Sequence, residues 1–383
     1  VTTDTPNGSD GGARVLDTLV IGGGQTGLTV GYELAQRGQD FLILDAAERV
    51  GDVWRSRWDS LVLFTPSGFF EMPGMDFPAP AEHFVTKDEV ADFIEQYATE
   101  LKLPVISNTR VTHLGKDDGG VFVAATADGN YRARNVIVAM ANYQVPRIPE
   151  LAADLDPEIK QIHSRDYANP GSLQDGPALV VGMGNSGAEI GLELALNRQT
   201  HISGKPTAVI PFRIEGWFGR KMGIKLVRFM ATKVLNTSTP LGRKARPKML
   251  GKASPVVRVK MRDLKSAGAD LVPRVAGVEN GRPQLEDGRT LDVRNVVWCT
   301  GYRPGFDWID FPIFGEDGKP KHERGVVNDV PGLYFCGLFF QHSLWSETVV
   351  GMPMAAPFVV DRVAGPLSDQ TIASRRAAGR RAS

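Results

Sequence analysis

Two glycine motifs of the form G-x-G-x-x-G constrain the fold of this chain more than any other feature. The first follows an apolar run and has its glycines at Gly22, Gly24 and Gly27. The second also follows an apolar run, with glycines at Gly182, Gly184 and Gly187. In such a strand-to-helix turn the first glycine makes the turn, the second lets a pyrophosphate approach, and the third lets the helix pack closely. One motif alone is weak evidence, but two in this context predict two bound dinucleotides.

The residues after each motif predict which dinucleotide it holds. The apolar run 41–44 ends at Asp45, and an acid about 20 residues beyond the glycines accepts ribose hydroxyl hydrogen bonds, as for FAD or NAD. The corresponding run after the second motif carries Ser203 and Lys205 instead of an acid. These side chains can receive the 2′-phosphate of NADP, although Lys205 is also compatible with an ordinary solvated turn lysine. We therefore predict FAD at the first site and NADPH at the second.

Composition excludes several classes of protein. The sequence has no run of 18 apolar residues, so we expect no membrane-spanning helix, and its zero net charge favours no nucleic acid partner. Its two cysteines, Cys299 and Cys336, lie in apolar runs and are expected to be buried thiols, which fits a cytoplasmic protein. Their spacing excludes a C-x-x-C disulfide reductase. The six histidines form no metal-ligand pattern, so we expect no metal.

The order of segments predicts an α/β protein with two Rossmann-like dinucleotide-binding domains, the NADPH domain being inserted in the FAD domain. We expect the FAD domain to comprise residues 14–150 and 295–364, and the NADPH domain residues 151–294. A helix is predicted at about 87–101 and another at about 346–363. Residues 1–13 and 365–383 are expected to be a disordered lead and a disordered tail.

The chain resembles the class B flavin-dependent monooxygenases over roughly residues 15–364. This family includes the flavin-containing monooxygenases, their Baeyer–Villiger relatives and the bacterial flavoproteins named as cation-efflux-associated oxidoreductases. Besides the glycine motifs, the resemblance rests on three segments, residues 51–58 (GDVWRSRW), 161–167 (QIHSRDY) and 299–302 (CTGY).

The match to the family signature F-x-G-x-x-x-H-x-x-x-[FYW] is partial. His163 and Tyr167 fit, but Pro157 and Ile159 stand at the Phe and Gly positions. The Ala-Thr-Gly linker motif is altered to 139–142 (AMAN), and Leu338 replaces the aspartate that often follows the last flavin strand. These departures favour the looser bacterial group over the other branches.

The resemblance implies an NADPH- and O₂-dependent monooxygenase. NADPH would reduce FAD, the reduced flavin would react with O₂ at C4a, and one oxygen atom would pass to a small organic substrate at N, S or a carbonyl. It places Trp54 and Arg55 along the flavin, the alternative being simple packing of this loop, and it makes Arg55 and Asn142 the candidate catalytic residues. His163 is expected to link the two domains. Motifs and resemblance together assign cofactor contacts to Gly22, Gly24, Gln25, Thr26, Gly27, Asp45, Ala46, Gly51, Trp54, Val111, Gly182, Gly184, Asn185, Ser186, Gly187, Ser203, Lys205, Thr300, Gly301, Gly337 and Leu338.

The segment 216–262 holds 13 Lys or Arg residues and no Asp or Glu. The expected apolar face of its helix consists of Gly223, Leu226, Val227, Met230 and Val234, while Lys221, Lys225 and Arg228 lie elsewhere on the helical wheel. We interpret the segment as a helical insertion covering the active site. The alternative is an interfacial helix on anionic lipid, or a cap that admits lipophilic substrates.

Three functions remain open at this point. The first is the monooxygenase, with a small organic substrate and O₂ as partners. The second is a reductase that passes electrons to a quinone, a metal or a partner protein without inserting oxygen. The third is a nucleotide-binding regulatory protein that catalyses little. Peripheral membrane contact through residues 216–262 and assembly into a homodimer also stay open.

Overall fold

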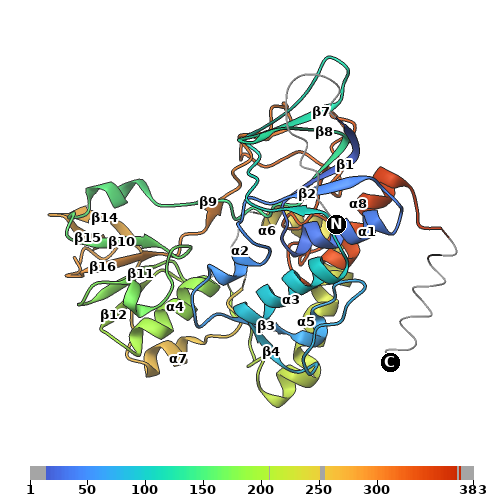
Figure 1. Cartoon of the computed structure of the whole chain (residues 1–383). Coiled ribbons are helices and arrows are strands. Elements are labelled where there is room, and N and C mark those ends of the chain that lie inside the picture. The colour runs from blue at the N-terminus through green and yellow to red at the C-terminus, as the bar shows by residue number, and fades with distance from the viewer. Residues whose placement is uncertain (1–13, 207, 251–254, 369–370, 372–383) are drawn as a thin grey trace.

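In the computed structural model the chain forms two lobes, each built on its own β-sheet (Figure 1). The structure describes residues 14–206, 208–250, 255–368 and 371. The expected disorder of residues 1–13 and of most of the tail therefore lies outside the described residues. None of the helices in the described part of the chain is long and apolar enough to cross a membrane.

The first lobe contains a seven-stranded sheet in the order β5-β2-β1-β8-β7-β6, with β18 paired to β8. Its strands are β1 (Val15–Ile21), β2 (Phe41–Leu44), β5 (Val105–Ile106), β6 (His113–Lys116), β7 (Phe122–Thr126), β8 (Gly129–Val138) and β18 (Leu333–Phe335). Strand β8 pairs antiparallel with β7 through its first half and parallel with β18 through its second half. The β1–β2 and β1–β8 pairs are parallel, as the predicted βαβ unit requires.

Helices α1 (Gln25–Ala35), α3 (Lys87–Glu100) and α8 (Met352–Ala364) belong to the first lobe, where α1 packs against both α3 and α8. Helix α3 agrees with the prediction at 87–101 and begins with a capping box between Thr86 and Glu89. Helix α8 begins at Met352, later than predicted. The short helix α2 (Asp52–Arg55) and the hairpin β3 (Val62–Pro66) and β4 (Phe84–Thr86) complete this lobe.

The second lobe contains a five-stranded parallel sheet in the order β10-β16-β11-β12-β13. Its strands are β10 (Lys160–His163), β11 (Ala178–Val181), β12 (Thr200–Ser203), β13 (Asp270–Val272) and β16 (Asn295–Trp298), with helices α4 (Asn185–Ala195) and α7 (Met261–Ser266) and the hairpin β14 (Val275–Glu279) and β15 (Arg282–Leu285) beside them. The predicted boundary at 294/295 is therefore wrong, because β16 pairs with β10 and β11 rather than with the first sheet. After β16 the chain returns to the first sheet, at β18.

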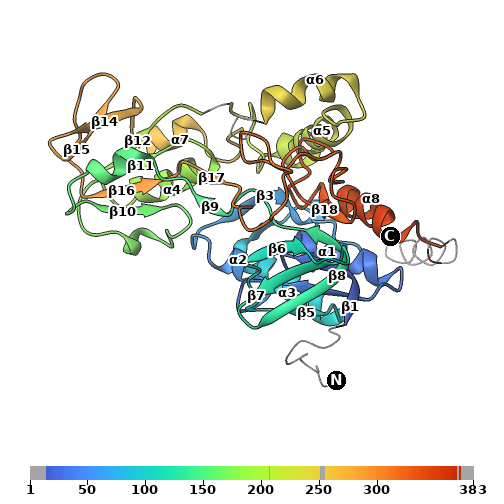
Figure 2. The same ribbon diagram turned by 90° about the horizontal axis from the view of Figure 1, so that it is seen from above.

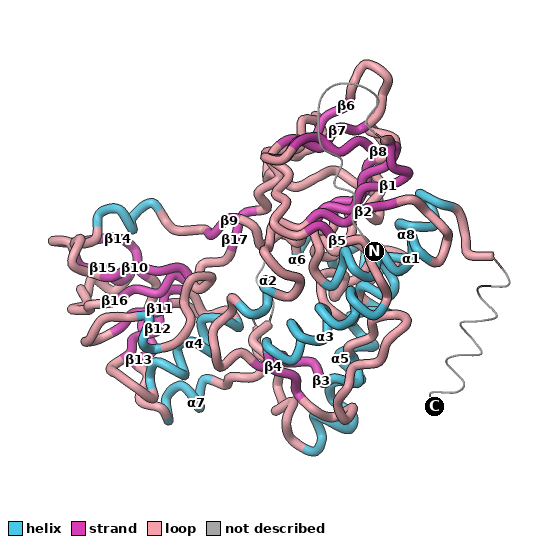
Figure 3. Tube along the Cα trace, in the orientation of Figure 1, coloured by secondary structure: helices cyan, strands magenta, loops and turns pink. Residues whose placement is uncertain are grey.

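The two lobes are joined by two short strands, β9 (Val145–Pro146) and β17 (Tyr302–Arg303), which pair antiparallel between them (Figure 3). The two crossings of the chain are thus held side by side by backbone hydrogen bonds. The residues that precede β9 and β17 consequently lie at the junction of the lobes.

Residues 219–250 of the basic segment leave the second lobe and pack on the first, whereas Val256 and Val259 belong to the core of the second lobe. The segment contains a helical stretch formed by η4 (Gly219–Gly223), α5 (Ile224–Phe229) and η5 (Met230–Val234), followed by α6 (Pro240–Met249). Figure 2 shows α5 and α6 beside α8 rather than over the second sheet. Backbone hydrogen bonds from Thr237 to His342 and from Leu344 to Leu235 fix this position.

Candidate functional site at the junction of two dinucleotide folds

Both glycine motifs form the expected strand–turn–helix geometry. Gly22 and Gly182 have φ values of 110° and 108°, in the left-handed region that favours glycine. A Cβ at Gly27 would lie 1.7 Å from the carbonyl oxygen of Gly22, and a Cβ at Gly187 would lie 1.8 Å from that of Gly182. The third glycine of each motif is therefore required for the turn itself.

The middle glycines differ from the third ones. A Cβ added at Gly24 or at Gly184 would have no protein atom within 4 Å, so the backbone there faces open space. Both residues are the N-caps of 11-residue helices, α1 and α4. The free amide groups and dipole of such a helix N-terminus favour a phosphate.

Around the first turn, Asp45 is bound to the backbone. Its carboxylate accepts hydrogen bonds from the amides of Gly23 and Ala47, each at 3.1 Å. Burial raises the pKa of Asp45, and the backbone amides oppose that shift. Thr26, in the first turn of α1, lies against the turn at Gly337 and contacts the sulfur of Met352 at 3.0 Å. The α1 N-terminus thus meets both β2 and the turn after β18.

Trp54 reaches the same helix start. Its indole N–H donates to the side-chain oxygen of Gln25 over 3.1 Å. Gly51 has a φ of 95°, and a Cβ added to it would lie 2.6 Å from the carbonyl oxygen of Ala91 in α3. The glycine therefore lets the start of α2 approach α3 closely. The predicted cofactor residues Gln25, Gly51 and Trp54 are therefore brought together beside the first turn.

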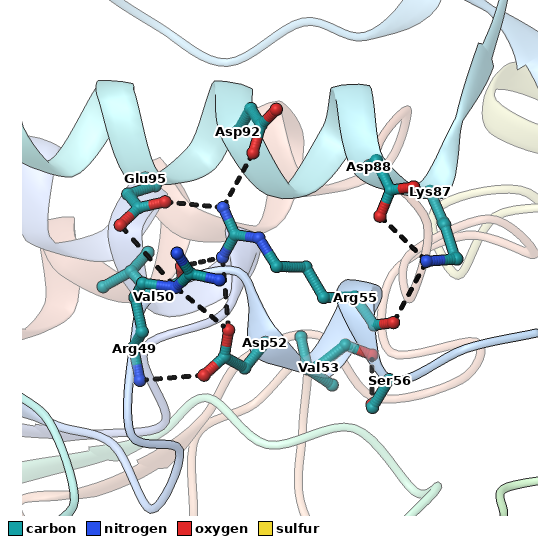
Figure 4. Close-up of polar contacts among 10 residues, drawn as sticks. All are labelled: Arg49, Val50, Asp52, Val53, Arg55, Ser56, Lys87, Asp88, Asp92 and Glu95. Atoms are coloured by element: carbon teal, nitrogen blue, oxygen red, sulfur yellow. Dashed lines mark hydrogen bonds and ion pairs between the residues drawn. The ribbon is translucent and has the colours of Figure 1, made fainter. Parts of the chain in front are cut away.

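The guanidinium of Arg55 is held by carboxylates of α2 and α3, which does not favour its expected catalytic role. Its guanidinium binds Asp52, Asp92 and Glu95, at 3.2, 2.8 and 2.5 Å, and the carbonyl of Val50 (Figure 4). Desolvation is the largest single effect on the pKa of Arg55 and lowers it, but the hydrogen bonds to the three carboxylates together outweigh it. The pKa of Arg55 is therefore raised. Arg55 joins α2 to α3 and has a structural role.

At the second site the hydroxyl of Ser203 is already bonded. It donates to the carbonyl of Pro273 at 2.9 Å and accepts from the amide of Val275 at 3.1 Å, and the residue is buried. The expectation that Ser203 binds a 2′-phosphate is therefore wrong for its side chain. Lys205 is exposed, and Arg274, also exposed, follows β13, the parallel neighbour of β12. Both basic residues follow strand ends at the same edge of the sheet.

Asn185 and Leu338, two predicted cofactor contacts, each have a polar group that is already hydrogen-bonded within the protein. The side-chain Nδ2 of Asn185 donates to the carbonyl of Pro255 at 3.0 Å, and its Oδ1 accepts from the backbone amide of Val257 at 2.9 Å. Leu338 is buried, and its backbone amide donates to the side chain of Gln341 at 3.1 Å. Asn185 can still contribute its backbone amide at the start of α4, beside Ser186.

Four further predicted cofactor residues lie beyond β2, in the first-lobe core and after β16. Ala46 is exposed beyond β2, and Val111 is buried in the apolar cluster that contains Leu44. The Thr300 hydroxyl donates to the carbonyl of Arg147, and the carbonyl of Gly301 accepts from the amide of Arg147 at 2.9 Å. Thr300 and Gly301 thus join the two crossings between the lobes.

His163 also belongs to this junction. Its Nε2 lies 3.0 Å from the Gly301 carbonyl, and its ring packs edge-on against Tyr302 with centroids 4.9 Å apart. Burial lowers the pKa of His163, so the neutral ring is favoured. This is the interdomain link that the sequence predicts.

Asn142 lies at the same junction, just before β9. Its side-chain oxygen is buried and has no hydrogen-bond partner in the described structure. An unsatisfied buried acceptor costs about 1–3 kcal/mol, so a bound molecule with an N–H or O–H group would be favoured there.

Four functional candidates at the junction were missed by the sequence analysis. The guanidinium of Arg57 donates to the Tyr302 hydroxyl at 3.2 Å, and Tyr302 packs edge-on against Tyr143 with ring centroids 5.7 Å apart. The Tyr143 hydroxyl donates to Glu347. Burial raises the pKa of Glu347 to about 7, although the hydrogen bond from Tyr143 opposes this shift. Arg57 and Tyr302 lie inside the quoted segments 51–58 and 299–302, and Tyr143 directly follows the linker segment 139–142, so these segments could have indicated all three. Glu347 has no local signal.

The comparisons with known proteins agree with this geometry. Residues 19–203 match the pyridine nucleotide-disulphide oxidoreductase family. The chain is 38% identical over 358 residues to an uncharacterized CzcO-like oxidoreductase of Geobacillus kaustophilus, across 91% of this chain and 99% of that protein. It is 29% identical to a probable indole-3-pyruvate monooxygenase, YUCCA9, of Arabidopsis thaliana, across 83% of each. A flavin-containing monooxygenase from Stenotrophomonas maltophilia is 26% identical with a TM-score of 0.73, across 91% of this chain and 98% of that one.

The chain belongs to the CzcO-like oxidoreductase family. This places it among the class B flavin monooxygenase-like proteins, as a flavin-dependent enzyme whose cofactors are FAD and NADPH. The residues of this CzcO-like enzyme fit both cofactors, because the open backbone at Gly24 and Gly184 leaves room for two pyrophosphates and Asn142 offers an unpaired acceptor between the lobes.

The matched family is described as pyridine nucleotide-disulphide oxidoreductase, but the two thiols of this CzcO-like enzyme do not fit attack on a disulfide. Burial raises the pKa of both Cys299 and Cys336 to about 12. A thiol attacks a disulfide as the thiolate, which such a pKa strongly disfavours at neutral pH. The two sulfurs also lie in different lobes, since Cys299 directly follows β16 and Cys336 directly follows β18.

Proposed function

We propose that the enzyme is an NADPH- and O₂-dependent monooxygenase that inserts one oxygen atom into a small organic substrate at N, S or a carbonyl. The observation that carries this proposal is the junction itself. The two glycine turns belong to different sheets, and the polar group formed by Arg57, Asn142, Tyr143, Tyr302 and Glu347 lies where the chain crosses between them. The similarity to flavin monooxygenases supports oxygen insertion over simple electron transfer.

We assign FAD to the first lobe and NADPH to the second. Asp45, with the Gly22–Gly27 turn and Trp54, would hold FAD, whereas the Gly182–Gly187 turn would hold the NADPH pyrophosphate. When bound, the two cofactors supply hydride transfer and the reduction of O₂. Lys205 and Arg274 would give the second lobe its preference for a 2′-phosphate.

The residues of the junction would position the reacting groups and exclude water. Asn142 would accept a hydrogen bond from a cofactor N–H, which satisfies its buried oxygen. Arg57 would supply positive charge where negative charge develops. Glu347, with a pKa of about 7, can hold or release a proton near neutral pH through its hydrogen bond with Tyr143.

A coupling assay tests this function. NADPH oxidation should be measured with a panel consisting of a thioether, a tertiary amine, a cyclic ketone and indole-3-pyruvate. A monooxygenase consumes NADPH and O₂ in equal amounts and yields an oxygenated product from at least one class. If the enzyme instead transfers electrons to a quinone without O₂ and oxygenates no member of the panel, it is a reductase and the proposal is wrong.

A further inference from the structure

The exposed apolar side chains of the protein concentrate on the basic segment. Among the described residues, 13 large apolar side chains are exposed, and seven lie within residues 217–241. These seven are Trp217 (75% exposed), Phe218 (46%), Met222 (59%), Leu226 (57%), Phe229 (56%), Met230 (40%) and Leu241 (53%). The predicted apolar face is therefore split, because Leu226 and Met230 are exposed whereas Gly223 is buried. Gly223, Ile224 and Ala231 are buried residues that face the protein interior.

Exposed lysines share this apolar face. The helical stretch 219–234 carries four of these apolar side chains at helical spacing. Leu226 follows Met222 by four residues, and Phe229 and Met230 follow Leu226 by three and four. Lys225 and Lys233 fall within the same spacing pattern and are exposed. On α6, exposed Lys244 and Lys248 follow Leu241 at the same kind of spacing. The face is thus apolar and positively charged together, and residues 216–262 contain no acid.

The other predicted lipid-facing charges have protein partners. Lys221 forms an ion pair with Glu82 at 2.5 Å, and Arg228 forms one with Glu71 at 2.7 Å. These two pairs hold the helical stretch against the first lobe. Arg220 is also exposed, but it donates to the carbonyl of Glu215 and lies over the Phe84 ring. Among the described residues, the exposed lysines of this stretch that form no ion pair within 4 Å are Lys225 and Lys233, although Lys225, after Lys221, contributes to the electrostatic lowering of the Glu82 pKa. These two lysines are therefore the ones to substitute.

We propose that residues 217–241 form a docking surface for an anionic lipid bilayer. Apolar side chains interleaved with lysines match an interface in which acyl chains lie beneath negatively charged headgroups. A second copy of this chain fits less well, because a twofold contact would place this positively charged face against an identical positively charged face. A lid over a substrate would turn these apolar side chains inward, yet they are exposed.

Co-sedimentation of the full chain with vesicles tests the proposal. The protein should sediment with phosphatidylcholine vesicles that contain phosphatidylglycerol and remain in solution with phosphatidylcholine alone. Raising the salt from about 0.1 M to 1 M shortens the Debye length from about 10 Å to 3 Å and should release the protein. The double variant Lys225→Gln, Lys233→Gln should bind about 25-fold more weakly, or about fivefold for each lysine lost. The double variant Leu226→Ser, Phe229→Ser should also lose binding.

Matched controls come from the second lobe. Leu196→Ser removes a side chain that is 71% exposed, and Lys160→Gln removes an exposed lysine, and neither should change vesicle binding. All variants should retain FAD and NADPH oxidation, which shows that they are folded. The proposal is overturned if the wild-type protein stays in solution with anionic vesicles at low salt, or if the controls weaken binding equally. It is also overturned if the face proves to be a dimer contact that Leu226→Ser, Phe229→Ser disrupts in sedimentation velocity.

Discussion

The indole N–H of Trp54 donates to the side-chain oxygen of Gln25 over 3.1 Å, which ties α2 to the first residue of α1. This bond connects two motifs that are separate in sequence, the first glycine turn and the segment 51–58. Trp54→Phe should therefore weaken FAD binding about fivefold, the equivalent of about 1 kcal/mol for one hydrogen bond. Titration of the apoprotein with FAD measures this, and Trp217→Phe is the control because Trp217 is exposed. Equal affinity in wild type and Trp54→Phe would contradict the assignment.

Gly24→Ala and Gly27→Ala should fail in different ways. A Cβ at Gly24 has no protein neighbour within 4 Å, so the variant should lose FAD and unfold at the melting temperature of the FAD-free wild type. A Cβ at Gly27 collides with the Gly22 carbonyl, so that variant should destabilise the lobe itself. Flavin absorbance and thermal unfolding separate the two effects. A yellow, FAD-saturated Gly24→Ala protein would refute a pyrophosphate at this turn.

Substitution of Arg55 should affect mainly stability, whereas substitution of Arg57 should affect mainly turnover. Arg55→Gln removes the ion pairs to α3 and should lower the free energy of unfolding by about 1–3 kcal/mol while leaving turnover of the folded fraction unchanged. Arg57→Gln should lower turnover roughly 10²-fold, the scale of a lost preorganised charge, with little change in stability. Urea titrations and steady-state kinetics on both variants test this, and the opposite pattern would restore Arg55 as the catalytic residue.

Coenzyme selectivity should depend on Lys205 and Arg274 but not on Ser203. Lys205→Ala should weaken NADPH by roughly 1–3 kcal/mol and leave NADH almost unchanged, since only NADPH carries the 2′-phosphate. Ser203→Ala should destabilise the protein without changing the NADPH/NADH ratio, because its hydroxyl is bonded to Pro273 and Val275. The ratio of kcat/KM for the two coenzymes is the measurement. Equal losses of both coenzymes in Lys205→Ala would show that this lysine does not read the phosphate.

Glu347 should make a pH-dependent contribution to stability. Its pKa is raised from 4.5 to about 7 in the folded protein, so between these values the folded state holds a proton that the unfolded chain has released. The contribution of Glu347 is therefore full below pH 4.5 and is lost as the pH rises to 7. Because His322, with a pKa lowered to about 4, acts in the opposite direction, the comparison must be between variant and wild type.

The expected result is that Glu347→Gln gains stability relative to wild type as the pH rises from 4.5 to 7, as measured by denaturant titrations at a series of pH values. Glu286→Gln, at an exposed carboxylate, should run parallel to wild type. A constant difference between Glu347→Gln and wild type across this range would show that Glu347 is not buried in the protonated form.

The sequence predicted the features that local chemistry determines. The glycine turns and helix α3 follow from spacing and residue type, the link at His163 follows from the family resemblance, and the structure contains each of them. The α/β class with two dinucleotide folds is likewise confirmed.

The errors arose where partners lie far away in sequence. Arg55 is directed by Asp92 and Glu95 on a later helix, and Ser203 is occupied by residues beyond β13. Which side of the helical stretch 219–234 is buried is determined by its packing on the first lobe. A helical wheel carries no information about that packing. The domain boundary at 294/295 separated β16 from the sheet it joins, because strand pairing, unlike strand formation, is not a local property.

Labelling with ¹⁸O₂ tests the monooxygenase most directly. The enzyme, NADPH and a converted member of the substrate panel are incubated under ¹⁸O₂ in ordinary water, and the product is analysed by mass spectrometry. Oxygen insertion predicts one ¹⁸O atom in each product molecule. Product oxygen that comes from water, or NADPH consumption with all of the ¹⁸O in hydrogen peroxide or water, would contradict it.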